Sequence, residues 1–236
     1  MEKANSIFKE NMDLYMKHVK NTREKVVCYL DILGFKNKVE NNLENAALLP
    51  FVMMIQAKEA ETDIRYYSFS DCMYLTCEKN KINTLIKVVS FIQYNLLMCS
   101  PMLIDKVNGD GKCKIENVNL IRGAITFGEV VEFDDFNAFG NAINKGYLLE
   151  SKEAIYPRII IDDELYSYFK DRNDIIKDDD EKYYVDFIKQ MGKEIDNNKD
   201  NIFMIYEYID NYLKENQDAI EKYEWFNSYI NKAYNF

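Results

Sequence analysis

Two aspartates stand where predicted strands end, a position from which a carboxylate can bind a cation. Asp31 closes an apolar run that begins at Val26, and a glycine turn follows it at Gly34. A glycine there lets the backbone approach a ligand, so the arrangement suits a metal or phosphate site. Asp71 follows Ser70 at the tip of a predicted hairpin. If these strands are neighbours, the two aspartates could share divalent metal ions.

The hydrophobic pattern predicts the strands and helices that would position these aspartates. We expect strands over 25–32 and 156–161, hairpins over 63–77 and 118–133, and helices over 37–61, 82–98 and 140–154. Pro50 is expected to break or kink the first helical region, and Gly128 to lie in the tip of the second hairpin. Together these elements predict a domain over residues 23–162.

The two ends of the chain have a different character. Residues 1–22 carry a helical pattern, and we expect a helix that packs on the domain or on a partner chain. Residues 163–236 are predicted to form an extension packed on the same domain, with a short strand and further helices rich in tyrosine. A charged loop is expected over 174–182, and its run Asp178-Asp179-Asp180 is interpreted as solvated and not as a metal site.

Four blocks of sequence resemble, in order, those of the class III nucleotidyl cyclases. They are Asp-Ile-Leu-Gly-Phe at 31–35, Ser-Asp at 70–71, Arg-Gly-Ala-Ile-Thr-Phe-Gly-Glu-Val at 122–130 and Phe-Gly-Asn-Ala-Ile-Asn-Lys-Gly-Tyr-Leu-Leu-Glu-Ser at 139–151. The resemblance implies an α+β fold, namely a ferredoxin-like class III cyclase catalytic domain. Its βαββαβ core would have an antiparallel sheet with helices on one face, plus a C-terminal helical extension.

The resemblance also implies an activity and its cofactors. In this family the ribose 3′-oxygen of a nucleoside triphosphate attacks the α-phosphorus, which yields a 3′,5′-cyclic nucleotide and pyrophosphate; the enzyme is a phosphorus–oxygen lyase. Asp31, Asp71 and the carbonyl of Ile32 would bind two Mg²⁺ or Mn²⁺ ions. Backbone donors would touch the phosphates at Leu33, Gly34, Phe35 and Lys36. The side chain of Lys36, where the family has threonine or serine, is either a phosphate contact or a solvated lysine.

A helix block carries one match and one departure. Asn144 matches the asparagine that contacts the ribose from the opposite subunit, so the resemblance implies a homodimer with shared active sites. Leu148 stands where the family usually has the arginine that stabilises the pentavalent phosphate. Arg122 and Lys145 are the candidates to replace it, although Arg122 is also interpreted as a structural ion-pair residue.

Two positions are predicted to read the base. Tyr67 stands where adenylyl cyclases have lysine and guanylyl cyclases glutamate, and Asn137 where adenylyl cyclases have aspartate. An amide both donates and accepts hydrogen bonds, and a tyrosine is bulky, so this pair would suit a smaller pyrimidine ring. UTP is the first choice of substrate and CTP the second. The tail over 221–231 is similar to that of the bacterial Pycsar antiphage cyclases, which are implied to make cyclic pyrimidine nucleotides that signal to a separate effector.

Two other functions stay open at this point. One is an adenylyl or guanylyl cyclase with a remodelled base pocket. The other is a non-catalytic module of cyclase fold that binds a nucleotide and signals through dimer contacts. Leu148 favours this module, and the two aspartates together with Asn144 argue against it.

Composition narrows the class of protein further. The 236 residues have a formal net charge of −10 and a hydrophobic share of 47%, enough for a substantial core. The acidic balance argues against binding to nucleic acid or to an anionic membrane. With five cysteines, no Cys-x-x-Cys pattern and a single histidine, we expect free thiols, no histidine-based chemistry and a cytoplasmic protein.

Overall fold

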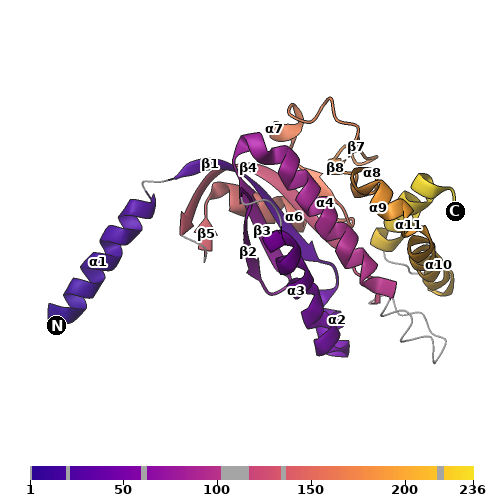
Figure 1. Cartoon of the computed structure of the whole chain (residues 1–236), viewed down its shortest axis with the longest axis horizontal. Coiled ribbons are helices and arrows are strands. Elements are labelled where there is room, and N and C mark those ends of the chain that lie inside the picture. Colours follow the sequence, from indigo (N-terminus) through magenta and orange to yellow (C-terminus); the bar gives the residue numbers. More distant parts are fainter. Residues whose placement is uncertain (1, 20–21, 60–62, 102–116, 134–136, 217–220) are drawn as a thin grey trace.

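The computed structural model of the chain describes residues 2–19, 22–59, 63–101, 117–133, 137–216 and 221–236. The described strands form one mixed sheet in the order β2-β3-β1-β4-β6-β8-β7, with β5 paired to the end of β4 (Figure 1). The strands are β1 Arg23–Ile32, β2 Arg65–Phe69, β3 Cys72–Cys77, β4 Ile121–Phe133, β5 Asn137–Phe139, β6 Ile159–Ile161, β7 Ile175–Lys177 and β8 Tyr183–Val185.

Helices cover both faces of this sheet. They are α1 Glu2–Val19, α2 Phe35–Asn41, α3 Leu43–Glu59, α4 Ile82–Met98, α6 Asn141–Glu153, α7 Asp163–Tyr166, α8 Phe187–Met191, α9 Lys193–Asp196, α10 Lys199–Glu215 and α11 Glu221–Tyr234, with a 3-10 turn at Lys79–Lys81. In Figure 1, α3 and α4 lie across one face of the sheet and α8 to α11 gather at its far end. Among the described helices, none is long and apolar enough to cross a membrane.

Alternation along β1 separates the two faces. Leu30 and Ile32 point into the main apolar cluster, which also contains Leu49 of α3 and Leu85 of α4. Val27, from the opposite set, joins Tyr67, Val130, Ala138 and Ala142 in a second cluster. Full burial of an aliphatic side chain stabilises a fold by about 1.5–3 kcal/mol, so these two clusters hold the sheet between its helices.

The α+β class is confirmed, with two corrections to its details. The sheet is mixed, because β4 and β6 are parallel while its other strand pairs are antiparallel. A parallel pair needs a crossover, and α6 is part of the connection from β4 to β6. Helices also cover both faces and not one: Gly146 of α6 packs on Tyr29 and Thr126, and Ala142 lies in the second cluster.

Three predictions about elements need correction, and the hairpin over 63–77 and the helix over 82–98 are confirmed. The first helical region breaks at Asn42, and Pro50 lies inside α3, where Leu49 and Met53 are buried on either side of it. Residues 121–133 form one strand that stays paired with β1 through Gly128, so Gly128 is not in a hairpin tip. The predicted loop over 174–182 contains β7, which pairs with β8.

The run Asp178-Asp179-Asp180 is also not simply a solvated loop. Arg158, only 1% exposed, forms ion pairs with both Asp178 and Asp180. Trp225 of α11 donates its indole hydrogen to Asp178 at 2.6 Å. The rings of Trp225 and Tyr184 each lie 5.5 Å from the Arg158 guanidinium. This cluster, which we call the Arg158 anchor, joins β6, β8 and α11 through one buried cation.

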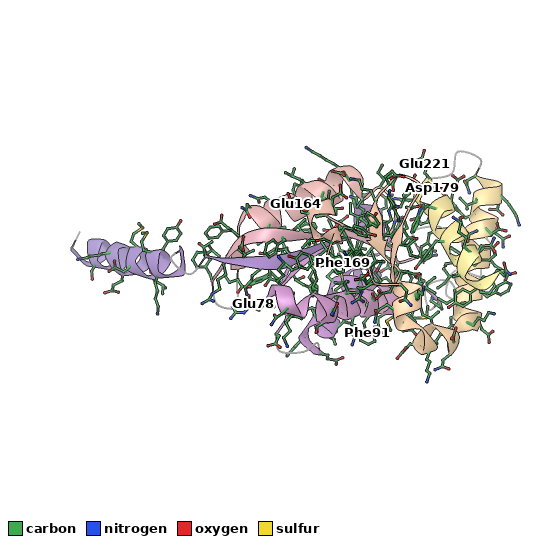
Figure 2. All side chains as sticks on the ribbon, turned by 90° about the horizontal axis from the view of Figure 1, so that it is seen from above. Glu78, Phe91, Glu164, Phe169, Asp179 and Glu221 are labelled. Carbon is green, nitrogen blue, oxygen red and sulfur yellow. The ribbon has the colours of Figure 1, made fainter. Side chains whose placement is uncertain are left out.

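The N-terminal helix lies apart from the sheet and the other helices in both views (Figures 1 and 2). Its Tyr15 ring stacks on Phe133 at the end of β4, with a centroid distance of 6.2 Å. Ile7, Leu14 and Met16 of the same helix are exposed. The contact with a partner chain therefore stays a prediction, whereas the contact with the domain is made at Tyr15. By contrast, Phe169, labelled near the middle of Figure 2, is fully buried.

Candidate active site

The two predicted metal-binding aspartates meet at one end of β1. Asp31 pairs in register with Cys72 of β3 on one side and with Arg122 of β4 on the other. Residues that pair directly in neighbouring strands point to the same face, so these three side chains form a row across the sheet. Asp71 precedes Cys72 in the turn, where Ser70 has a positive φ of 55°. The Ile32 amide donates to the Asp71 carbonyl at 3.2 Å, which ties the turn to the end of β1.

Ligand atoms of Asp31, Asp71 and Cys72 lie within 4.8 Å of one another. The thiol of Cys72 donates to Asp31 Oδ1 at 3.4 Å and approaches Asp71 Oδ1 at 4.0 Å. Two convergent carboxylates, partly withdrawn from solvent, are a donor set that fits Mg²⁺ or Mn²⁺. The carbonyl of Ile32 belongs to the residue next to Asp31, while its amide is already bonded to the turn.

Burial shapes the protonation of this cluster. Desolvation is the largest cause that raises the pKa of Asp31, and the charge of Asp71 adds to it, while the Cys72 thiol and Arg122 oppose it. Desolvation also raises the pKa of the Cys72 thiol to about 12, helped by the charges of Asp31 and Asp71. The thiol is therefore protonated at neutral pH. A bound cation would offset the same electrostatic penalty.

Arg122 and Glu150 form the inner edge of the site. Arg122 Nε lies 2.6 Å from Glu150 Oε1 and 3.4 Å from Asp31 Oδ2, so the interpretation of Arg122 as an ion-pair residue agrees with its geometry. Burial raises the pKa of Glu150 from 4.5 to about 7, the Arg122 cation opposes this, and the charges of Asp31 and Asp71 add to it. The pair joins α6 to the sheet beside the aspartates.

The segment after Asp31 turns away from the strand into a short helix. Gly34 has a positive φ of 70°, which favours glycine, and α2 begins at the next residue. The Leu33 amide donates to the Leu120 carbonyl at 2.9 Å, so this predicted phosphate donor already has a partner. The side chain of Lys36 is 85% exposed, and its Nζ lies 3.8 Å from Glu40 Oε1, one turn later on the same helix. The geometry of Lys36 is that of a solvated lysine.

The two predicted base-reading residues lie on either side of Tyr74. The ring of Tyr67 stacks on Tyr74 with centroids 5.0 Å apart. The Tyr74 hydroxyl lies 3.1 Å from both Asn137 Oδ1 and the Ala138 carbonyl, to either of which it can donate. Tyr67 is 6% exposed, and among the described residues the Arg65 guanidinium is the cation near its buried hydroxyl, whose pKa burial raises to about 12. Tyr67, Tyr74 and Asn137 therefore form one continuous polar and aromatic surface.

The residues of α6 do not complete the site within one chain. Asn144 is exposed, and no hydrogen bond joins its side chain to Asp31 or Asp71 among the described residues. Leu148, one turn later on the same helix, is 46% exposed. Lys145 forms ion pairs with Asp162 and Glu164, so one of the two candidates to replace the missing arginine is engaged elsewhere.

Sequence reasoning did not assign two residues that the structure places at the site. Cys72 follows Asp71 directly, but only the register of β1 and β3 brings its sulfur to Asp31. Glu150 stands in the recognised helix block, nearly thirty positions from Arg122, and only the packing of α6 on the sheet unites them. A glycine sets that packing: a Cβ at Gly140, just before α6, would lie 2.1 Å from the Glu129 carbonyl oxygen.

Comparisons with known proteins support the fold. No family model and no curated protein matches the sequence. Two solved structures, each of a bacterial light-regulated adenylyl cyclase, match 70% of this chain at 15% identity, with TM-scores of 0.51 and 0.50. The matched region spans 53% of the first of those chains and 91% of the second. The chain therefore has the α+β fold of class III nucleotidyl cyclase catalytic domains.

Proposed function

We propose that this protein is a nucleotidyl cyclase that converts a pyrimidine nucleoside triphosphate, UTP first and CTP second, to its 3′,5′-cyclic monophosphate and pyrophosphate. The observation that carries the proposal is the meeting of Asp31 and Asp71 at the end of β1 within a cyclase fold. Both are placed by strand register and a tight turn, which leaves little freedom to their backbones.

Asp31, Asp71 and the Ile32 carbonyl would hold two Mg²⁺ or Mn²⁺ ions. When bound, such ions lower the pKa of the ribose 3′-hydroxyl and neutralise the charge of the triphosphate and of the leaving pyrophosphate. The protein's own part is to orient the ribose oxygen in line with the α-phosphorus. We assign phosphate contacts to the backbone amides of Gly34, Phe35 and Lys36. The Leu33 amide would join them by giving up its hydrogen bond to the Leu120 carbonyl for one to a phosphate oxygen.

Base recognition is assigned to the surface formed by Tyr67, Tyr74 and Asn137. The buried hydroxyl of Tyr67, which lies near the Arg65 guanidinium, is the group that we expect to bond a base edge. The amide of Asn137 keeps its NH₂ group for a ligand when its oxygen accepts from Tyr74. A pocket whose polar groups would be left unpaired by the wrong base discriminates strongly.

Two chains are proposed to share each site. Asn144 is exposed on α6, so it is available to orient a ribose bound to a partner's aspartates. Leu148 cannot supply the positive charge expected beside it, and Lys145 and Arg122 are both paired with carboxylates. We therefore expect slow turnover, since a missing charge clamp raises the barrier. The role in antiphage signalling through a separate effector rests on the resemblance of the tail alone.

Two alternatives are kept because specific observations favour them. The two solved structures reported above are adenylyl cyclases, which favours a purine substrate with a remodelled pocket. The exposed Leu148 favours a module that binds a nucleotide without cyclising it.

The experiment that separates these functions is turnover with each of four nucleotides. Purified protein is incubated with ATP, GTP, CTP and UTP in Mn²⁺, and cyclic products are identified by mass spectrometry. We expect cyclic UMP or cyclic CMP, and none with Asp31→Asn or Asp71→Asn of unchanged circular dichroism. Cyclic AMP or cyclic GMP as the main product would establish the purine alternative. Nucleotide binding without any cyclic product would establish the non-catalytic module.

A further inference from the structure

We propose that Cys72 is a third protein ligand of the cation site at Asp31 and Asp71, which makes this site bind a thiophilic divalent cation such as Zn²⁺ in preference to Mg²⁺. The inference rests on the proposed function only for the identity of the metal site. Nothing in the resemblance to cyclases assigned Cys72, and its position follows from this chain's own strand register.

The donor atoms have the spacing of a metal-binding set. The Cys72 sulfur lies 3.4 Å from Asp31 Oδ1 and 4.0 Å from Asp71 Oδ1. In a tetrahedral zinc site, sulfur at about 2.3 Å and oxygen at about 2.1 Å from the ion lie roughly 3.6 Å from each other. The two sulfur–oxygen distances in this protein are close to that ligand–ligand distance. Small rotations of three side chains would therefore suffice to enclose one ion.

The backbone holds this sulfur in place. Cys72 opens β3 and pairs in register with Asp31, so both side chains stand on the same face of the sheet. Cys72 is half-buried, which leaves a path for an ion from solvent. The other described cysteines have different surroundings. Cys28 and Cys77 are buried in the main apolar cluster, and Cys99 packs against it.

The chemistry of the set discriminates between cations. Mg²⁺ prefers oxygen ligands and keeps much of its water, so it would engage Asp31 and Asp71 and leave the thiol protonated. Zn²⁺ and Cd²⁺ bind thiolate, so the thiol proton would leave to solvent as the metal–sulfur bond forms. Zinc bound to all three residues would then exclude the ions that the proposed reaction uses, and would inhibit turnover.

The test uses Cd²⁺ as a spectroscopic probe on the metal-free full chain. A cadmium–thiolate bond has an ultraviolet charge-transfer absorbance that carboxylates do not produce. We expect this absorbance to grow with Cd²⁺ and to saturate at one ion per chain. In Cys72→Ser the absorbance should be lost, and the affinity for Cd²⁺ measured by calorimetry should fall at least about tenfold. Cys99→Ser is the matched control, and it should behave as the wild type.

A second measurement guards against misfolding of a variant. Zn²⁺ binding is followed by calorimetry in two buffers of different ionisation enthalpy, which counts the protons released. The wild type should release one proton more than Cys72→Ser. The inference is overturned if the wild type gives no charge-transfer absorbance, or if Cys72→Ser keeps the absorbance and the affinity. Turnover in Mn²⁺ tests the proposed function separately. Cadmium–thiolate binding without any turnover would contradict the proposed function and would still support Cys72 as a metal ligand.

Discussion

Around Asp31, burial and negative charge concentrate on the same few atoms. Asp31, Asp71 and Glu150 place three carboxylates near a single arginine. Desolvation raises the pKa of Asp31 and of Glu150, because removal from water penalises the ionised form. Keeping these carboxylates ionised without a cation costs electrostatic free energy, and a bound divalent cation would offset that cost. At this scale we therefore expect protonation and metal binding to compete.

Glu150 gives this competition a measurable dependence on pH. Its pKa is raised in the folded protein from 4.5 to about 7, so between these values the folded state holds more protons than the unfolded state. The contribution of Glu150 to stability is therefore greatest at low pH and is lost as pH rises through about 7. In metal-free protein, urea denaturation of the wild type should lose more stability from pH 5 to 8 than that of Glu150→Gln. Parallel stability curves for the two proteins would contradict the expectation.

Base choice is a second prediction at the residue scale. Tyr67→Phe removes the buried hydroxyl, and Asn137→Ala removes the amide beside Tyr74. Each change should lower the ratio of kcat/KM for pyrimidine over purine triphosphates by at least about tenfold, because hydrogen bonds to the base edge carry the discrimination. Tyr66→Phe is the matched control, since Tyr66 packs against the cluster on the opposite face of the sheet. Unchanged ratios in both variants would place the base pocket elsewhere.

At the scale of elements, two devices hold helices to the sheet. α6 is held at one end by Gly140, whose backbone approaches β4 closely, and near the other by the pair Arg122–Glu150. α11 is held by the Arg158 anchor. The first device places the active-site helix. The second connects the C-terminal helices to β6 and β8, which lie between β4 and β7 in the sheet.

The Arg158 anchor predicts a large effect on stability from one substitution. Arg158→Met removes a buried cation and leaves the carboxylates of Asp178 and Asp180 without it. Breaking a buried pair by removing one partner lowers the free energy of unfolding by about 3–5 kcal/mol. Denaturant unfolding monitored by Trp225 fluorescence measures this loss. Asp179→Asn, at the exposed middle of the same run, should change stability by less than about 0.5 kcal/mol. If Arg158→Met lowers the free energy of unfolding by no more than Asp179→Asn does, the Arg158 anchor does not stabilise the fold.

At the scale of the whole molecule, the site is incomplete in one chain. Asp31 and Asp71 lie at the end of β1, while Asn144 and Leu148 are exposed on α6. A two-fold dimer presents each surface twice, so two chains could form two equivalent shared sites. The exposed apolar side chains of α1 are a further surface that a partner chain could cover.

Mixed dimers test the shared site. Asp31→Ala and Asn144→Ala, each inactive alone, are co-expressed, so that one site of a mixed dimer collects both lesions and the other collects none. Random pairing makes half of the dimers mixed, and turnover should recover to roughly a quarter of the wild-type value. Light scattering on the same sample checks that dimers are present. If dimers form and turnover stays at the level of the single variants, Asn144 acts within its own chain or not at all.

The linear sequence determined the class of fold and the main acidic residues. Periodicity and turn residues are local properties, so they located the helix Ile82–Met98 and the hairpin around Asp71. The resemblance then joined Asp31 to Asp71, although these residues are forty positions apart. Neither the local pattern nor the resemblance identified the partner of a strand when that partner lies far along the chain. For that reason residues 118–133 were predicted as a hairpin, whereas residues 121–130 pair with β1.

Tertiary structure alone decided which neighbours each functional residue has. Cys72 reached Asp31 through strand register, Glu150 reached Arg122 through helix packing, and the acidic run at 178–180 found a buried arginine. Each contact joins residues that are twenty to ninety positions apart or depends on which face of a strand is buried. Local patterns carry no information on these distances, because strand pairing and packing are selected by the whole core at once.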